Sequence, residues 1–236
     1  MAHPARIPLW LKVAYTLFMC VMVPTYWHAY GPLNFLWLCD ATAFVALLAI
    51  WLESALLASM GALAMTISQT LWTIDLLTRL FHVPLASLGP TNYMFDPGIP
   101  VFVRLVSLFH VWMPAMLLWM VWRLGYDRRA CAVQSVVTML ILEMSFLFTY
   151  RPPASPQHPG GVNINWVFGF GYQSPQKWMH PVLFVTLHML FYPLCIYLPT
   201  HLVFRKLFGQ SRQLSEAEAA EALAAQTVTD SGSSAL

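Results

Sequence analysis

Long apolar runs separated by short polar connections make up most of the chain. A helix that crosses a membrane needs about 20 consecutive, mostly apolar residues. The pattern predicts an all-α polytopic membrane protein in which residues 1–212 form a bundle of six transmembrane helices. Residues 213–236, rich in Ala, Glu, Ser and Gly, are expected to form a flexible cytoplasmic tail. The six predicted spans are residues 9–27, 33–52, 54–79, 101–124, 131–150 and 179–204.

The overall composition agrees with a membrane location. Hydrophobic residues make up 58% of the 236 residues and charged residues only 9%, whereas about a quarter of the residues in a soluble domain are charged. The formal net charge is +2, which gives no indication that the chain binds nucleic acid. The partners that this composition implies are membrane lipids, together with proteins that share the membrane.

The positions of the 12 Lys and Arg residues predict how the bundle is oriented. Eight of them lie near the N-terminus, between the fourth and fifth spans and after the sixth, and four lie elsewhere. Cytoplasmic segments of membrane proteins are enriched in Lys and Arg. We therefore expect both termini in the cytoplasm and the bundle to be integral to the cell (inner) membrane.

The ionisable residues inside the spans gather in one half of the bundle. A helix rises about 1.5 Å per residue, so sequence position gives depth, and these residues fall in the half away from the termini. Charge inside hydrocarbon is costly and usually marks a functional site whose partners lie nearby. The sequence therefore predicts a polar pocket that opens toward the outer leaflet. The residues are Asp40, Asp75, His110, Glu143 and His188.

Two long connections, residues 80–100 and 151–178, lie on the same side as this pocket. Long connections in a compact fold are usually either functional or disordered. We expect the first half of residues 151–178 to be disordered. The second half contains Asn163, Asn165 and Trp166 among glycines and aromatic residues, and we expect it to pack over the pocket as a cap.

Cys39 and His110 lie at similar depth on different helices and make a candidate catalytic pair. The charge of an imidazole changes near neutral pH, which suits a general acid or base. A thiol in apolar surroundings is inert unless an imidazole or a cation lies close by. The alternative interpretation is structural, with His110 bonded to a neighbouring helix and Cys39 a small buried side chain.

Asp40 is a carboxylate at the same depth, and it needs either a partner or a proton. Three roles fit it: orienting His110, binding a cation, and pairing with Arg104. Asp75 either supports the site or pairs with Arg79, which lies four residues further along the same helix.

The remaining candidates lie in the last two spans and the loop between them. Glu143 either faces the pocket or forms a hydrogen bond between helices. Asn163 and Asn165 alternate, so in an extended segment both amides face one side. There they either donate to an oxyanion or phosphate or cap the loop's own backbone. We predict no cofactor and no metal site; a haem or metal held by His110 and His188 is the less favoured alternative.

Three short motifs resemble those of a known family over roughly residues 30–200. The family is the YwaF family of bacterial six-helix membrane proteins, whose animal relatives include a transmembrane acyltransferase. The motifs are Leu38-Cys39-Asp40, His110 two spans later, and Asn163-Ile164-Asn165-Trp166 before the last span.

This resemblance implies a six-helix fold and the chemistry of lipid acyl transfer or hydrolysis. The acyltransferase uses a Cys–His pair on the fatty-acyl chains of phospholipids, and more distant relatives are lipid hydrolases with a Thr–His pair. By the resemblance, Cys39 matches the nucleophile and His110 its base. The chain departs from the family at Trp37, where a histidine is frequent, and at Trp166, where the usual residue is tyrosine.

The sequence supports two functional hypotheses. The first is an intramembrane lipid acyl hydrolase or acyltransferase, in which His110 takes a proton from Cys39 and the thiolate attacks a lipid ester. Asp40 or Asp75 would hold the imidazole. The second is a non-enzymatic accessory or binding subunit of a larger membrane complex. Transport is the least favoured function, because the chain has no internal repeat or paired broken helices.

Overall fold

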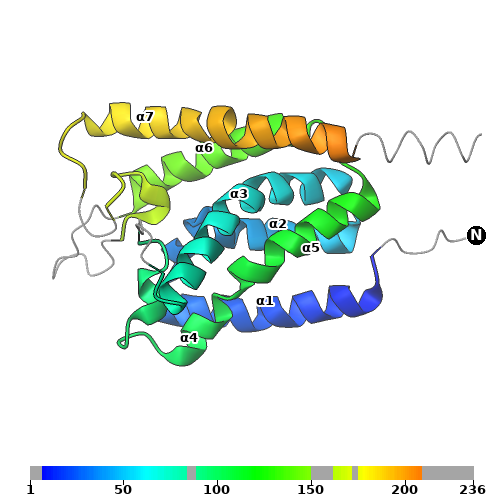
Figure 1. The fold of residues 1–236 in the computed structure, drawn as a ribbon, viewed down its shortest axis with the longest axis horizontal. Coiled ribbons are helices and arrows are strands. Elements are labelled where there is room, and N and C mark those ends of the chain that lie inside the picture. The colour runs from blue at the N-terminus through cyan, green and yellow to red at the C-terminus, as the bar shows by residue number, and fades with distance from the viewer. Residues whose placement is uncertain (1–6, 84–88, 150–161, 172–174, 209–236) are drawn as a thin grey trace, which may run out of the picture.

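The computed structural model describes residues 7–83, 89–149, 162–171 and 175–208, and these are helical or irregular, with no strand among them (Figure 1). The predicted tail and the first half of residues 151–178 lie outside the described residues. The principal helices are α1 (Leu9–Tyr30), α2 (Leu38–Leu52), α3 (Ala55–Leu80), α4 (Val101–Val106), α5 (Phe109–Leu124), α6 (Ala130–Phe148) and α7 (Pro181–Phe191). The short segments are η1 (Pro32–Leu36), η2 (Asn92–Phe95), η3 (Ile164–Trp166) and the π-helical η4 (Tyr192–Tyr197).

Five helical stretches in the described part of the chain are long and apolar enough to cross a membrane. This finding confirms the prediction of a helical membrane protein. The five stretches are Leu9–Tyr30, Ala55–Leu80, Val101–Leu124, Ala130–Phe148 and Pro181–Phe208.

The predicted second span, residues 33–52, is shorter than expected. Its first part is the 3₁₀ turn η1, and the extended backbone of Trp37 (φ −57°, ψ 132°) separates that turn from α2. The 15 residues of α2 extend over about 22 Å, less than the roughly 30 Å thickness of the hydrocarbon layer. Pro32, which has no N–H to donate, favours a separate turn here.

The connections divide the bundle into two ends (Figure 1). One end holds the start of α1, the end of the α7 stretch, the α2–α3 turn and residues 125–129; we call it the terminal end. The α2–α3 turn needs only two residues, because Glu53 adopts left-handed backbone angles and Ser54 caps α3 through the Leu57 N–H. The opposite end, formed by residues 31–37, 81–83, 89–100, 162–171 and 175–180, is the loop end.

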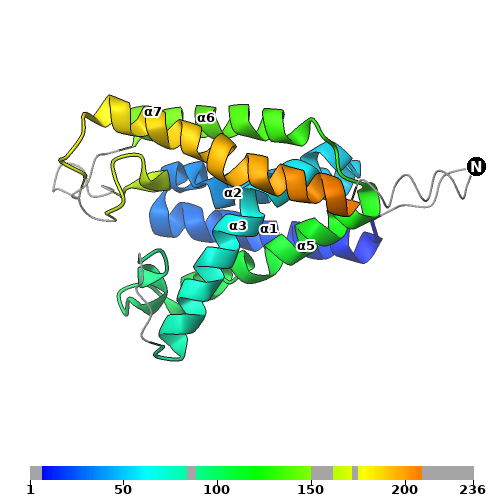
Figure 2. The same ribbon diagram turned by 45° about the horizontal axis from the view of Figure 1, so that its top comes forward.

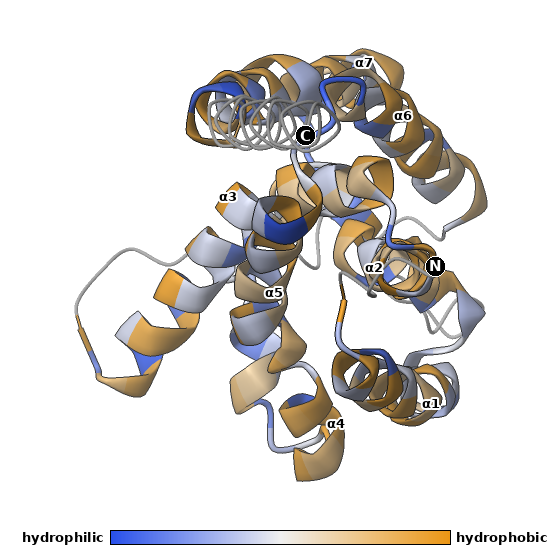
Figure 3. Cartoon of the chain, turned by 90° about the vertical axis from the view of Figure 1, so that its right-hand side faces the viewer, coloured by the Kyte–Doolittle hydropathy of each residue, from blue (hydrophilic) through white to orange (hydrophobic). Residues whose placement is uncertain are grey.

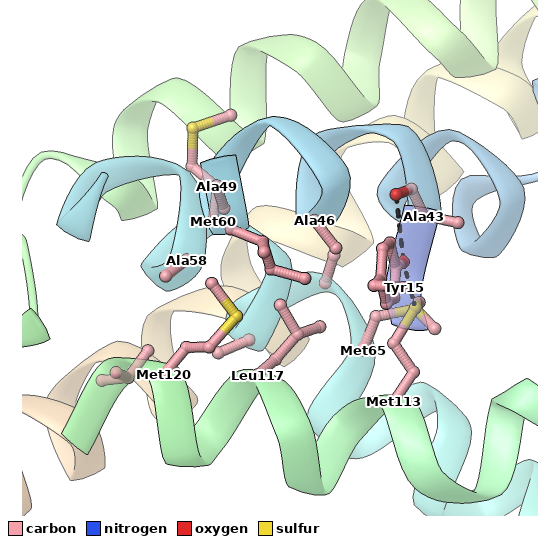
Figure 4. Packing of buried hydrophobic residues seen from close by; sticks show 14 of the residues in the cluster. Tyr15, Ala43, Ala46, Ala49, Ala58, Met60, Met65, Met113, Leu117 and Met120 are labelled. Carbon is pink, nitrogen blue, oxygen red and sulfur yellow. Dashed lines mark hydrogen bonds between the residues drawn. The ribbon is translucent and has the colours of Figure 1, made fainter. Parts of the chain in front are cut away.

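Helix α3 lies in the centre of the bundle and packs closely on α2 and α5. Gly61 permits this approach, because a Cβ atom there would lie 2.9 Å from Cδ2 of Leu117 on α5. Alanines on the facing sides of α2 and α3 allow similar close packing (Figure 4). Tyr15 of α1 donates a hydrogen bond to the carbonyl of Ala43, 3.0 Å away, and so fixes α1 against α2.

The outer helices expose apolar side chains. In the most apolar part of α3, 56% of the residues are buried, but only 22% are buried in the corresponding parts of α1, α6 and the stretch Pro181–Phe208. Hydrophobic residues cover most of the length of these helices (Figure 3). An apolar outer surface of this kind matches a hydrocarbon solvent, as the sequence predicts.

Two of the long helices are interrupted along their length. The predicted span 101–124 breaks at Ser107 and Leu108, where backbone hydrogen bonds join residues three apart. Pro114 contributes to this break, since it has no N–H for the carbonyl of His110. In the last span, Pro193 lies in the π-helical turn η4, and a missing N–H again disrupts the regular helix.

Candidate functional site

A cavity of about 900 Å³ lies at the loop end of the bundle. Its wall includes the end of α1, η1, the start of α2, the second half of α3 and residues of both long connections. Figure 2 shows the second half of α3 diverging from α6 and α7 on this side of the molecule. The volume falls within the range of small-molecule binding sites, about 300–1,000 Å³.

The structure brings together five of the nine predicted site residues. Those that line the cavity are Cys39, Asp40, His110, Asn165 and Trp166. Those that do not contribute to its described wall are Asp75, Glu143, Asn163 and His188.

His110 is held in one orientation by the break between α4 and α5. Its Nδ1 lies 2.6 Å from the backbone carbonyl oxygen of Ser107. Since a carbonyl only accepts hydrogen bonds, Nδ1 carries the proton and Nε2 of the neutral ring is an acceptor. The ring stacks on Trp72 with centroids 4.6 Å apart, and Nε2 has no hydrogen-bond partner among the described residues. The ring of His110 is therefore oriented by a backbone carbonyl rather than by Asp40 or Asp75.

Cys39 and Asp40 form a separate pair on the first turn of α2. The thiol of Cys39 donates to Oδ1 of Asp40 over 3.9 Å. The other oxygen of this buried carboxylate accepts a 2.6 Å hydrogen bond from Nδ2 of Asn34. No hydrogen bond joins Cys39 to His110 within the described residues. Arg104, the predicted alternative partner of Asp40, donates instead to the carbonyl of Met94, 3.0 Å away.

Asn165 joins three segments that are distant in sequence. Its Oδ1 accepts from the N–H of Leu38 at 2.9 Å, and its Nδ2 donates to the carbonyl of Leu36 at 2.6 Å and to Oγ of Ser145 at 3.0 Å. These bonds use both N–H groups of the amide, so none is left for the predicted oxyanion. Asn165 instead fixes the start of α2, which carries Cys39.

His188 supports the same arrangement from α7. Its Nε2 lies 2.9 Å from the backbone carbonyl oxygen of Asn165, so this nitrogen carries the proton and donates. Both His110 and His188 thus bond to backbone carbonyls. No cluster of three or more His, Cys, Asp or Glu side chains suited to a metal ion occurs in the part of the chain that the structure describes.

The other predicted residues have local roles or lie at the surface. Asn163 caps its own loop, because its amide bonds to the backbone of Phe168, Gly169 and Gly171. Glu143 is exposed on α6.

Asp75 is buried and does not pair with Arg79, the partner that the sequence suggested. Its Oδ2 accepts from both the N–H and the hydroxyl of Thr91. Arg79 donates to Oδ1 of Asn92 and lies over the ring of Phe95, 4.5 Å from its centroid. Asp75 and Arg79 thus each bind a different residue of the α3–α4 connection, Thr91 and Asn92, and so hold it against α3.

Asn34, Gln69 and Trp72 are among the cavity residues that the sequence did not single out. Nothing in the sequence indicated a functional role for Asn34 or Trp72, because asparagine is common in turns and tryptophan is common in apolar spans. Gln69 had a weak signal, since it is a carboxamide inside a predicted span and lies on the same half of α3 as Asp75.

Comparisons of the chain with protein-family models, with curated proteins and with solved structures found no match. Chemically, the cavity combines an acceptor nitrogen on His110, a thiol on Cys39 and a largely apolar wall. These groups suit proton transfer from a nucleophile to a base next to a bound apolar chain.

Proposed function

We propose that this protein is an intramembrane lipid enzyme, an acyl hydrolase or acyltransferase, with Cys39 as nucleophile and His110 as base. One observation carries the proposal: the thiol of Cys39 and the imidazole of His110 line the same cavity, and Nε2 of His110 has no hydrogen-bond partner among the described residues. The motif resemblance to the YwaF family agrees with these roles.

The reaction would begin with a change in the partner of Cys39. Its thiol donates to Asp40 in the resting structure, so the side chain must turn toward Nε2 of His110. Nε2 then takes the thiol proton, and the sulfur attacks the carbonyl carbon of a lipid ester. The bond to the lipid alcohol breaks, His110 returns the proton to that alcohol, and an acyl thioester remains on Cys39. Water or the hydroxyl of an acceptor lipid releases the acyl group.

The placement in the membrane follows the distribution of charge. We infer that η1 and α2 together complete a sixth crossing, and that both termini are cytoplasmic in the cell (inner) membrane. The cavity at the loop end would then open toward the outer leaflet, where a lipid chain can enter it.

A second function, an accessory or binding subunit of a membrane complex, is favoured by two observations. Cys39 bonds to Asp40 and has no hydrogen bond to His110 in the described structure. Glu143 is exposed in the middle of an apolar face of α6 that includes Leu140, Met144 and Leu147. A carboxylate inside hydrocarbon usually has a partner.

Covalent labelling distinguishes the two functions. The protein would carry Cys20→Ala, Cys131→Ala and Cys195→Ala so that Cys39 is its single thiol, and it would be treated in nanodiscs with a lipid-like, thiol-reactive acyl probe. We expect labelling at Cys39, at a rate that falls at least about 100-fold in His110→Ala.

The matched control is His201→Ala, because His201 bonds to Tyr126 at the terminal end, away from the cavity. This variant should label at the parent rate. Labelling that does not depend on His110, or that does not occur, would favour the binding subunit.

A further inference from the structure

The charged groups in the cavity wall are all acidic. Asp40 and Asp96 line the cavity, and no Lys or Arg does so among the described residues. Asp40 is only 2% exposed, whereas Asp96 is exposed. The cavity therefore has negative groups both in its buried wall and at an exposed position.

No cation of the chain neutralises these carboxylates in the described structure. The two ion pairs found there, Lys12–Glu53 and Arg129–Asp127, belong to the terminal end. Arg79 and Arg104 reach the α3–α4 connection, but they bond to Asn92 and to a backbone carbonyl. A buried carboxylate without an opposite charge is costly even where neutral groups donate to it, so a cationic occupant would be bound favourably.

Aromatic rings surround the same part of the cavity. Tyr26 and Tyr30 make an edge-to-face pair with centroids 5.5 Å apart, and Trp72 lies 6.4 Å from Tyr93. All four rings line the cavity. Aromatic faces attract cations, and the attraction is stronger where water is excluded.

Gln69 supplies an independent observation. The residue is 8% exposed and lines the cavity, and its buried Oε1 has no hydrogen-bond partner among the described residues. The hydroxyl of Ser68 gives its single proton to the carbonyl of Ala64, 2.7 Å away. It can therefore only accept from Gln69, which places Nε2 beside Ser68 and leaves Oε1 as the unpaired atom. An unpaired acceptor in a cavity wall needs a donor from the occupant.

We propose that the cavity binds the primary ammonium group of an amphipathic ligand, with Asp40, Asp96 and Gln69 as its acceptors. This inference rests on the proposed function and names its substrate class: a lipid with a primary-amine headgroup. A trimethylammonium group would satisfy the carboxylates and the aromatic rings, but it has no N–H for Gln69. The apolar remainder of the wall accommodates the acyl chains.

Binding of defined lipids to the full-length protein tests the proposal. Native mass spectrometry would compare phosphatidylethanolamine, phosphatidylcholine and phosphatidylglycerol with identical chains, using Cys39→Ala so that no lipid is consumed. We expect phosphatidylethanolamine to bind about tenfold more tightly than either of the others. Equal binding of the three lipids would overturn the proposal. A parallel titration with soluble phosphoethanolamine shows whether the ammonium site binds the headgroup alone, without acyl chains.

Variants of Gln69 identify the acceptor. Gln69→Met should remove the preference for phosphatidylethanolamine over phosphatidylcholine, while Gln69→Glu, which keeps an acceptor, should retain it. Gln134→Met is the matched control, because Gln134 is a buried carboxamide that bonds to Thr138 outside the cavity. A preference that survives in Gln69→Met would contradict the role of Gln69.

Asp96→Asn provides a test that does not depend on a buried substitution. This exposed side chain is expected to contribute about two- to fivefold to the preference for phosphatidylethanolamine over phosphatidylglycerol. The binding assays also separate this inference from the proposed function. A headgroup preference without labelling of Cys39 would keep the ammonium site and reject the proposed enzyme. Labelling of Cys39 without a headgroup preference would keep the proposed enzyme and reject the ammonium site.

Discussion

At the scale of single residues, Asn165 shows how one side chain organises the candidate site. Its φ of 52° is left-handed, a conformation that asparagine adopts more readily than most residues. From that position its amide reaches backbone groups on both sides of Trp37, while its own carbonyl accepts from His188. The start of α2 is therefore fixed by a loop rather than by a cap of its own.

Replacing this side chain should loosen α2 at the cavity. Asn165→Ala leaves the Leu38 N–H and the Leu36 carbonyl without their partner, which we expect to cost about 2–4 kcal/mol. Hydrogen exchange of the backbone amides at the start of α2 should rise. Asn163→Ala is the control, since Asn163 bonds only within residues 163–171. Equal exchange at α2 in both variants would contradict this role of Asn165.

The tautomer of His110 can be observed directly. Because the carbonyl of Ser107 accepts from Nδ1, we expect the neutral ring to carry its proton on Nδ1 and to leave Nε2 bare. Nitrogen NMR of protein with ¹⁵N-labelled histidine, with His110→Gln used for assignment, measures this. A proton on Nε2 at neutral pH would show that His110 is not arranged as a base toward the cavity.

At the scale of elements, the contact between α3 and α5 depends on the absence of a side chain at residue 61. Leu117 is fully buried against Gly61, so there is little room for extra atoms. The contact also sets the distance between Trp72 on α3 and His110 on α5, whose rings stack in the cavity wall.

A graded series at this position tests the contact. In Gly61→Ala the crowding of Leu117 is offset by the higher helix propensity of alanine, about 1 kcal/mol, so a small net change is expected. Gly61→Leu should destabilise the protein by about 1–3 kcal/mol through overpacking. Thermal unfolding in detergent measures both, and Leu117→Ala should recover part of the loss in Gly61→Leu. Additive effects in that double variant would argue against direct contact.

At the scale of the whole molecule, the sequence predicted the helices better than their orientation about their axes. Continuous apolar runs fix which residues are helical, and all five long spans were predicted. The breaks at Ser107 and in η4 were missed, because apolarity continues through them. Hydrogen bonds between residues three or five apart do not alter the hydrophobic pattern.

For the candidate site, sequence position likewise predicted the depth of residues but not the direction of their side chains. Depth grouped Cys39, Asp40 and His110, and these three residues line one cavity. Depth says nothing about direction around the helix, which changes by about 100° per residue. Glu143 was therefore predicted for the pocket but is exposed on α6. His188 was placed near the pocket but does not line it; it contacts the wall residues Asn165 and Tyr192 from outside.

The topology of the whole bundle is the last point to test. If η1 and α2 cross the membrane, both ends of the chain lie on one side, together with residues 125–129. Reporter fusions at each terminus should then give the cytoplasmic signal, and a glycosylation or accessibility tag in residues 92–99 should give the opposite one. Termini on opposite sides would mean that α2 does not cross.

The bond between Asn165 and Leu38 also bears on how the protein is made. It joins residues 127 positions apart, which a ribosome needs about 6–25 s to synthesise. During that time the start of α2 is inserted in the membrane without its partner, so a half-made chain has no finished cavity. The contacts of Asn165 are completed only after His188 has been made, so a chain stalled before that point would lack the finished wall of the cavity.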